Sequence, residues 1–247
     1  MIILGLAGQA GTGKDTVALY LQERYGFIPF SFSDALYKEV ATAFGLESED
    51  LLRNRATKEV RNYDLRLDQC SDKKFVDLAI NLAMTALDEP PDLGPLILKR
   101  ALSPRQILQW WGTEYRRAQD PGYWVRAARR WVTNLRAAYP YEELRPQYFV
   151  NTSVRFENER EMISYTAYHE TDDATSWEGN IWHVHRDTAQ PVHAHESETP
   201  LPVLDGEREI WNNADLQHLY AGVDVLLSSN VKFVRCEPME TPEQETT

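Results

Sequence analysis

The sequence predicts an α/β fold in which a parallel central sheet lies between layers of helices. Three observations lead to this class. The apolar run at residues 2–7 indicates a buried strand, and a glycine-rich segment containing a lysine follows it directly, with a helical pattern after that. A second strand at residues 27–32 and a second helix at 35–44, capped by Ser33 and Asp34, come next. Strands that alternate with helices in this way form parallel sheets.

The segment after the first strand matches a phosphate-binding loop. Gly8, Gly13 and Lys14 fit the spacing G-x-x-x-x-G-K, in which main-chain N–H groups surround a polyphosphate and the lysine contacts its β- and γ-phosphates. The N-terminus of the following helix favours anions through its dipole. This refines the fold class to a P-loop NTPase-type three-layer sandwich. We expect the nucleotide to contact Gly8, Gly11, Thr12, Gly13, Lys14, Asp15, Thr16 and Val17.

One position of the loop departs from the motif. Asp15 stands where the loop usually offers a Ser or Thr hydroxyl to magnesium, and Thr16 is the next available hydroxyl. We expect ATP and Mg²⁺ as cofactors, with Thr16 and Asp15 near the metal, directly or through water. The alternative is a glycine-rich turn that only joins a strand to a helix.

The rest of the chain continues the alternation, with a helical stretch in the middle. Residues 46–98 read as helices with a polar centre, and Ser103 and Pro104 have the chemistry of a helix start. Further elements are expected as helices over 103–117, 121–138, 155–168 and 214–227 and strands at 148–150, 181–185 and 210–211, with a polar connection at 169–180.

The 247 residues suffice for one domain with insertions. We expect a single domain over 1–236, a helical substrate-binding insertion at about 46–140, a lid at about 187–205 and a disordered acidic tail at 237–247. No apolar run approaches the roughly 20 residues of a membrane span, and the chain begins with a strand rather than a leader. Cys70 and Cys236 lack metal-ligand spacing. A soluble, cytoplasmic protein without membrane partners is expected.

Charge is spread unevenly along the chain. The net charge of −12 argues against non-specific nucleic-acid binding. Between Lys99 and Arg136, however, nine basic residues face only Glu114 and Asp120. A basic segment in an acidic protein suggests a confined anionic ligand, although a solvated helix face is the alternative for Arg129, Arg130 and Arg136.

Colinear motifs extend over nearly the whole sequence. They are Gly13-Lys14-Asp15-Thr16; Ser103-Pro104-Arg105-Gln106-Ile107-Leu108-Gln109 before Gly112-Thr113-Glu114; Tyr123-Trp124-Val125; Val154-Arg155 with Asn158-Glu159; His195-Glu196-Ser197-Glu198 before Leu201-Pro202; and Ile210 with Asn212-Asn213. In these motifs and their order, the chain resembles the bacteriophage deoxynucleoside monophosphate kinases, which are P-loop enzymes related to adenylate and guanylate kinases. The resemblance implies a kinase in the host-cell cytoplasm. Because related enzymes are often dimers, it also implies a homodimer as one expectation.

A kinase of this type needs cations at the acceptor phosphate. Arg105 and Arg155 are the first candidates, because guanidinium groups bind phosphate through two hydrogen bonds. Together with Lys14 they form the predicted catalytic set. Trp124 offers either a stacking surface or core packing, and Glu159 either orients Arg155 or pairs with it at the surface. The predicted acceptor-binding residues are Lys38, Lys58, Arg105, Gln109, Gly112, Thr113, Trp124, Arg155 and Glu159, with Arg116 and Arg117 as weaker candidates.

Two residues depart from the family pattern. Tyr37 stands where the family often has lysine, and Ser153 ends a strand that usually ends in aspartate, whose carboxylate would help to position magnesium through its water ligands. The spacing of His183 with His185 and of His193 with His195 also permits a zinc site, which we regard as a minor alternative.

These observations indicate three functions, which we give in order of preference. The first is phosphoryl transfer from ATP to deoxynucleoside 5′-monophosphates, giving diphosphates for phage DNA synthesis. The second keeps the kinase but makes 5-hydroxymethyluracil within phage DNA the acceptor, so that DNA is a partner only in this alternative. The third is a nucleotide-binding protein without turnover, which the departures at Tyr37 and Ser153 favour.

Overall fold

The computed structural model describes residues 1–87, 94–141, 145, 147–164, 177–189 and 200–229. The chain divides into two compact units. Unit 1 comprises Met1–Phe32 and Ala128–Thr247, and unit 2 comprises Ser33–Ala127. The predicted tail at 237–247, most of the predicted lid, and His193 and His195 lie outside the described residues. Among the described residues, no helix has the length and apolar character that a bilayer crossing requires.

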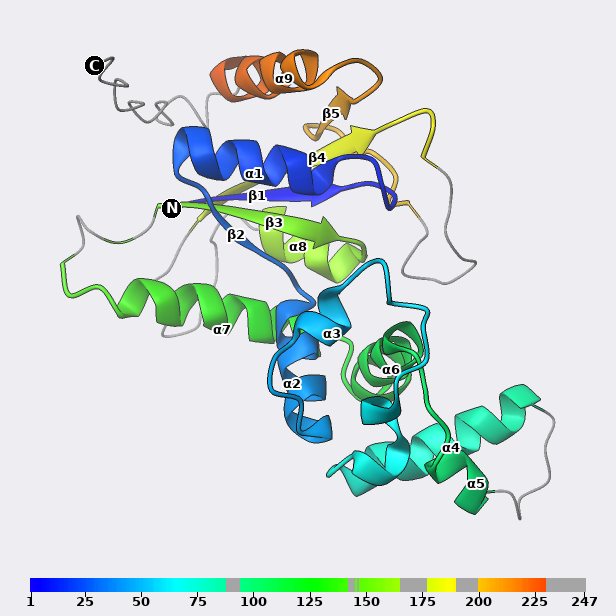
Figure 1. Ribbon diagram of the computed structural model, residues 1–247. Helices are drawn as coiled ribbons and strands as arrows, with labels where there is room; N and C mark the ends of the chain where they lie inside the picture. The colour runs from blue at the N-terminus through cyan, green and yellow to red at the C-terminus, as the bar shows by residue number, and fades with distance from the viewer. Residues whose placement is uncertain (88–93, 142–144, 146, 165–176, 190–199, 230–247) are drawn as a thin grey trace, which may run out of the picture. The chain divides into compact units, whose positions relative to one another are not determined.

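Unit 1 is built on a five-stranded sheet in the order β2-β3-β1-β4-β5, and every pairing in it is parallel (Figure 1). This order and the helices that flank the sheet are those of a P-loop NTPase-like three-layer sandwich, so the predicted fold class is confirmed. The strands are β1 (Ile2–Ala7), β2 (Ile28–Phe30), β3 (Tyr148–Val154), β4 (Glu178–His185) and β5 (Arg208–Trp211).

Helices cover both faces of this sheet. On one face, α1 (Lys14–Tyr25) and α9 (Leu216–Ser229) bury Leu4 and Leu6 of β1. On the other, α8 (Glu157–Ser164) approaches the strands so closely that a Cβ added at Gly179 of β4 would lie 1.7 Å from the carbonyl oxygen of Ile163. Successive residues of β1 point to opposite faces, which explains why the whole strand is apolar and buried.

Unit 2 is helical and has its own apolar core. Phe75 and Trp111 lie at its centre, with ring centroids 4.5 Å apart, and Cys70 is buried in the same core. The elements of the helical part are α2 (Asp34–Phe44), α3 (Asp50–Arg53), η1 (Tyr63–Leu65), η2 (Leu67–Gln69), α4 (Lys73–Leu87), α5 (Gly94–Leu98), α6 (Pro104–Gln109), η4 (Trp110–Arg117) and α7 (Tyr123–Ala137), the last of which crosses the division between the units.

The helix predicted over 103–117 has an unexpected geometry. Ser103 caps its start, since its hydroxyl accepts a hydrogen bond from the Gln106 N–H at 3.3 Å, as the sequence indicates. From Trp110 to Arg117, however, the chain forms a π-helix. Each turn of a π-helix closes an i→i+5 hydrogen bond. Gln109 and Thr113 are four residues apart, and the angle between their side chains around the helix axis therefore differs from that in an α-helix.

Other predicted elements differ mainly at their ends. The second strand covers only Ile28–Phe30, although Phe27 and Phe32 are buried beside it. Helix α2 begins at Asp34, but Ser33 makes no side-chain capping hydrogen bond. Strand β4 begins at Glu178, inside the segment predicted to be a connection. Residues 165–168 of the predicted helix at 155–168 lie outside the described residues.

A carboxylate joins α1 to α9 in unit 1. Asp224 accepts hydrogen bonds from the hydroxyl groups of Tyr20 at 2.8 Å and Tyr25 at 2.7 Å. Burial and the hydrogen bond to Asp224 raise the pKa of Tyr20 from 10.0 to about 12 and raise the pKa of Tyr25 still further. Both phenols therefore stay protonated in the folded protein at a pH where the unfolded chain ionises them.

This predicts a loss of stability in alkaline solution. The contribution of the two phenols is complete below pH 10 and declines as the pH rises from 10.0 toward the folded-state pKa of about 12, because only the unfolded state releases protons there. A double variant, Tyr20→Phe with Tyr25→Phe, should show a flatter decline in the free energy of unfolding over this interval. Denaturant titrations at several pH values measure it, and parallel slopes in the two proteins would contradict the assignment.

Candidate functional site

The glycine loop, residues 8–16, joins β1 to α1 and has a shape that depends on glycine. Gly8, Gly11 and Gly13 have φ values of 135°, 81° and 105°. Side chains other than glycine are strained in this range. Gly13 is also the N-cap of α1 and provides no side chain to cap it. The first N–H groups of the helix therefore lie at the loop, as an anion site requires.

Hydrogen bonds within the loop hold the lysine over it. Lys14 Nζ donates to the carbonyl oxygens of Gly8 and Gln9, both at 2.7 Å. Thr12 is buried, and its hydroxyl donates to the same Gln9 oxygen at 3.0 Å. The ammonium group and the main-chain donors of the loop are thus concentrated in one place, where they can bind phosphate oxygens.

Neighbouring strand ends support the loop. A Cβ at Gly8 would lie 2.3 Å from the carbonyl oxygen of Val184, at the end of β4. The carbonyl oxygen of Thr12 accepts a hydrogen bond from Asn212 Nδ2 at 2.9 Å, just beyond β5. The loop is therefore packed on the carboxyl ends of β4 and β5, the edge of a parallel sheet where α/β proteins bind ligands.

Arg155 lies at the same edge of unit 1. Ala7 pairs with Val154 in the β1–β3 ladder. Gly8 and Arg155 therefore directly follow the last paired residues of two adjacent strands. Glu159, which is 2% exposed, accepts hydrogen bonds from the main-chain N–H groups of Arg155 at 2.9 Å and Phe156 at 3.3 Å. Glu159 thus acts as a cap that fixes the main chain at Arg155, and its burial disfavours the surface-pair alternative.

Oxygen atoms of the kinds that magnesium prefers occur at the start of α1 and at the ends of β2 and β3. Asp15 is exposed at the first turn of α1, and Thr16 follows it. At the ends of β2 and β3, the hydroxyl oxygens of Ser31 and Ser153 lie 2.6 Å apart. Carboxylate, hydroxyl and water oxygens are the ligands that Mg²⁺ prefers, so the chemistry of these side chains would suit this metal, with a small contribution from the protein.

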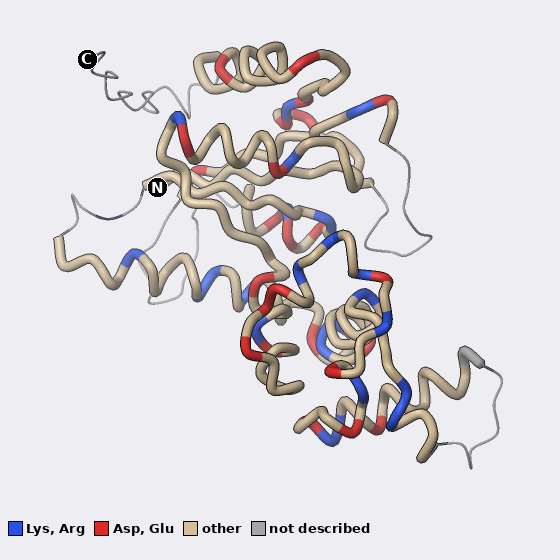
Figure 2. The backbone as a smooth tube through the Cα atoms, in the orientation of Figure 1, with Lys and Arg blue, Asp and Glu red and all other residues tan. Residues whose placement is uncertain are grey.

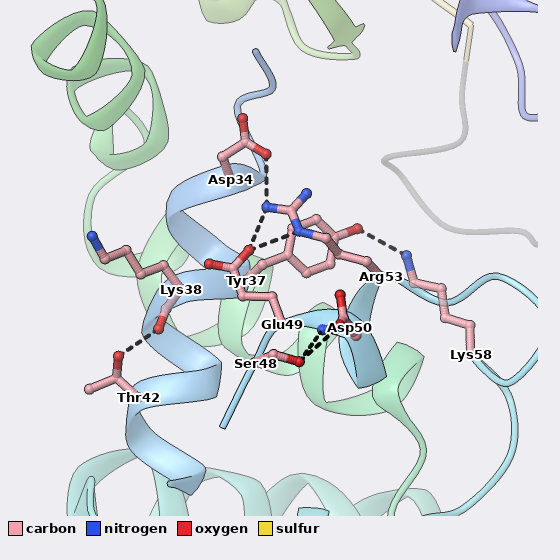
Figure 3. A network of polar contacts seen from close by, with 9 residues as sticks. All are labelled: Asp34, Tyr37, Lys38, Thr42, Ser48, Glu49, Asp50, Arg53 and Lys58. Carbon is pink, nitrogen blue, oxygen red and sulfur yellow. Dashed lines mark hydrogen bonds and ion pairs between the residues drawn. The ribbon is translucent and has the colours of Figure 1, made fainter. Parts of the chain in front are cut away.

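Tyr37 of unit 2 contacts Lys58, one of the predicted acceptor residues, and Arg53 (Figure 3). The Arg53 guanidinium lies 4.3 Å from the centre of the Tyr37 ring and pairs with Asp34 at 3.0 Å and Glu49 at 2.6 Å. Lys58 Nζ donates to the Tyr37 hydroxyl at 3.2 Å. Tyr37 therefore contacts two cationic side chains, those of Arg53 and Lys58.

Arg105 belongs to the same group. Its main-chain N–H donates to the carbonyl oxygen of Lys58 at 2.9 Å, and its guanidinium pairs with Glu59. The structure thus brings Lys58 and Arg105 together, although 47 residues separate them in the sequence. Lys38 is exposed on α2. Sequence reasoning named these three residues, and Arg53, which it did not name, lies against Tyr37 beside Lys58.

The carboxylate of Glu39 joins the π-helix η4 to α2. Glu39 of α2 accepts hydrogen bonds from Trp111 Nε1 and Arg116 Nε, both at 2.9 Å, and from the Tyr123 hydroxyl. Burial alone would lower the pKa of Arg116, but the hydrogen bond and charge of Glu39 raise it overall. Arg116 therefore has a structural partner, which explains one of the basic residues between Lys99 and Arg136.

The remaining predicted acceptor residues lie on or beside η4. Trp124 is buried, and its indole N–H donates to the carbonyl oxygen of Gly112 at 3.0 Å, which favours the packing role over the stacking role. Gly112 is buried as well, and a Cβ there would lie 3.2 Å from Leu36. Gln109 and Thr113 are partly buried. Binding of the acceptor by this group stays a prediction.

The histidines of β4 pair with carboxylates. His183 Nε2 lies 2.7 Å from Glu207 Oε2, and His185 Nε2 lies 2.9 Å from Glu209 Oε2. The side chain of Arg160 is also buried against Glu207, at 3.2 Å. Among the described residues, no group of three or more His, Cys, Asp and Glu side chains could hold a metal ion.

The parallel sheet with helices on both faces is a P-loop NTPase-like α/β fold. No protein-family model matches the chain. The chain is similar to a protein of Acanthamoeba polyphaga mimivirus named "Putative deoxynucleotide monophosphate kinase", with 38% identity over 76 residues. The match covers 31% of this chain and 38% of that relative.

The support of the loop by β4 predicts unequal effects of alanine at two glycines. Gly8→Ala should lower the free energy of unfolding by about 3 kcal/mol, because it combines a positive φ with a close contact to the Val184 carbonyl. Gly11→Ala is the matched control. It has no atom within 4 Å of the added Cβ and should cost about 1 kcal/mol. Urea denaturation measures both, and equal costs would contradict the close packing.

The role of Glu39 predicts a similar contrast in unit 2. Glu39→Ala should destabilise the protein by about 3 kcal/mol, because it leaves a partly buried arginine, an indole N–H and a phenol without their shared acceptor. Glu49→Ala removes one of the two carboxylates that pair with Arg53, whose side chain is 41% exposed, and should cost less than about 1 kcal/mol. Thermal and urea denaturation test this, and a loss at Glu39 no larger than at Glu49 would exclude the structural role.

Proposed function

We propose that the protein is an ATP-dependent kinase that transfers the γ-phosphoryl group of ATP to deoxynucleoside 5′-monophosphates. The observation that carries this proposal is the glycine loop, in which three glycines of positive φ, a helix start and the Lys14 ammonium converge at the carboxyl edge of a parallel sheet. The similarity to the mimivirus protein supports a nucleotide-kinase role. The products would be diphosphates for phage DNA synthesis.

Phosphoryl transfer to a monophosphate requires little covalent chemistry, because the acceptor phosphate is already a nucleophile. The loop amides and Lys14 would bind the β- and γ-phosphates and offset their charge. Thr16 and Asp15 would hold Mg²⁺, which supplies further charge neutralisation when bound. The close packing of Gly8 on β4 keeps these donors in place, so that little reorganisation is needed during transfer.

The acceptor phosphate would be bound by arginines. Arg155 follows the strand next to β1, and Glu159 fixes its main chain. In unit 2, a main-chain hydrogen bond joins Arg105 to Lys58, and these two residues are further candidates for binding the acceptor phosphate. A guanidinium group that binds both the acceptor and the transferred phosphoryl group stabilises charge in the transition state. We further propose a cytoplasmic location and a homodimer.

The alternative acceptor, 5-hydroxymethyluracil within DNA, receives less support. DNA binding needs a continuous basic surface. In the described parts of unit 2, acidic residues are interspersed among the basic ones (Figure 2), and Arg105, Arg116 and Arg126 pair with Glu59, Glu39 and Asp120. Incubation with labelled ATP and either free deoxynucleoside monophosphates or hydroxymethyluracil-containing DNA decides between the two acceptors. Absence of transfer to either, with ATP still bound, would favour a binding protein without turnover.

Two substitutions test the proposed roles directly. Lys14→Ala should abolish detectable phosphoryl transfer while leaving the far-ultraviolet circular dichroism spectrum unchanged, because it removes the cation of the loop. Arg155→Ala should lower kcat/KM for the acceptor by about 100-fold or more, a typical loss for one group that stabilises the transition state. Arg130→Ala, on the exposed face of α7, is the control and should leave the kinetics unchanged. Normal turnover by Lys14→Ala would refute the mechanism.

A further inference from the structure

Asn212 links the last strand of the sheet to the glycine loop. The residue is 8% exposed, and its Nδ2 donates a hydrogen bond of 2.9 Å to the carbonyl oxygen of Thr12. The same amide lies against the next residue, because a Cβ at Gly13 would lie 2.4 Å from Asn212 Nδ2. Asn212 therefore contacts the two residues that immediately precede Lys14.

The sheet fixes the position of Asn212. Its main-chain N–H donates to the carbonyl oxygen of His185 at 2.8 Å, which extends the β4–β5 ladder one residue beyond the pair of His185 and Trp211. The Trp211 ring stacks on His185 with the centroids 4.6 Å apart. Because a carbonyl oxygen only accepts hydrogen bonds, the amide nitrogen, rather than the amide oxygen, must face Thr12.

This contact determines the orientation of one peptide group of the loop. The peptide bond between Thr12 and Gly13 is trans and planar, so its C=O and N–H point in opposite directions. Holding the Thr12 carbonyl against Asn212 directs the Gly13 N–H to the other side. Glycine at positions 11 and 13 makes reversal of peptide planes easy, because glycine occupies both signs of φ at little cost. The loop thus needs an outside group to select one orientation.

We propose that Asn212 is a positioning residue of the donor-nucleotide site. It keeps the Thr12 carbonyl turned away from the bound polyphosphate, so that an N–H group rather than a carbonyl oxygen faces the anion. The inference rests on the proposed function, since it assumes that the loop binds phosphate. It differs from a stacking or base-reading role, because the contact is with the main chain of the loop.

The test compares two ligands by isothermal titration calorimetry. ATP carries base, sugar and phosphates, whereas inorganic tripolyphosphate carries only the phosphate chain. Asn212→Asp keeps the shape of the side chain and places an acceptor against the Thr12 carbonyl, and Asn212→Ala removes the amide without adding charge. Both variants should bind ATP and tripolyphosphate about tenfold more weakly, the loss expected for one hydrogen bond. The KM for the acceptor should stay unchanged.

The neighbouring asparagine provides the matched control. Asn213 is exposed, and its side chain donates to Asp187 Oδ2 at 2.9 Å. Asn213→Ala should bind both ligands within twofold of the wild type. Should Asn212→Ala fail to fold, the isosteric Asn212→Asp decides the question, with its melting temperature as the check on folding.

The outcomes separate the two proposals. Wild-type protein that binds neither ligand would overturn the proposed function and, with it, the role of Asn212. Wild-type binding with undiminished affinity in folded Asn212 variants would overturn only the role of Asn212. A loss for ATP that is absent for tripolyphosphate would also overturn it, because Asn212 would then act on the nucleoside.

Discussion

The close approach of main chains at the carboxyl edge of the sheet is the constraint on which the candidate site depends. Gly8 leaves no room for a side chain beneath the Val184 carbonyl, and Gly13 leaves none beneath Asn212. The loop is therefore shaped from outside, by the ends of β4 and β5, as well as by its own hydrogen bonds. Because Arg155 follows β3 on the other side of β1, the sheet order also determines which side chains lie beside the loop.

A different interaction organises unit 2. There the carboxylate of Glu39 joins α2 to η4 and to the start of α7, through Trp111, Arg116 and Tyr123. A π-helix is an unfavourable conformation that persists only where tertiary contacts stabilise it. The aromatic core around Phe75 and the shared acceptor provide these contacts. The basic run in the sequence is thus partly a set of structural ion pairs rather than a continuous cationic surface.

The parts of the fold that the sequence predicts well are those with local signals. The β1–loop–α1 unit follows from an apolar run and a glycine motif, and the start of α6 follows from the Ser103 cap. The start of β4 and the π-helix were not predicted, because their stability comes from partners distant in the sequence. The contact of Asn212 could not be predicted from the sequence for the same reason, because Asn212 lies 200 residues from its partner Thr12.

The residues of the candidate site also differ in whether the sequence predicts their roles. Spacing alone identifies Lys14, and the chemistry of phosphate recognition suggests Arg105 and Arg155. Glu159 acts as a cap and Trp124 as a core residue because each forms hydrogen bonds with particular main-chain groups. The tertiary structure determines which main-chain groups these are. A polar residue whose partner is a backbone atom leaves no pattern in a single sequence.

The thiol of Cys70 provides a natural reporter for unit 2. It is 2% exposed in the aromatic core, and burial raises its pKa to about 11, so that the reactive thiolate is scarce at neutral pH. Alkylation of this cysteine therefore requires the core around Phe75 to open. The rate of modification, located by peptide mass spectrometry, measures how often unit 2 opens, without an introduced label and independently of catalysis.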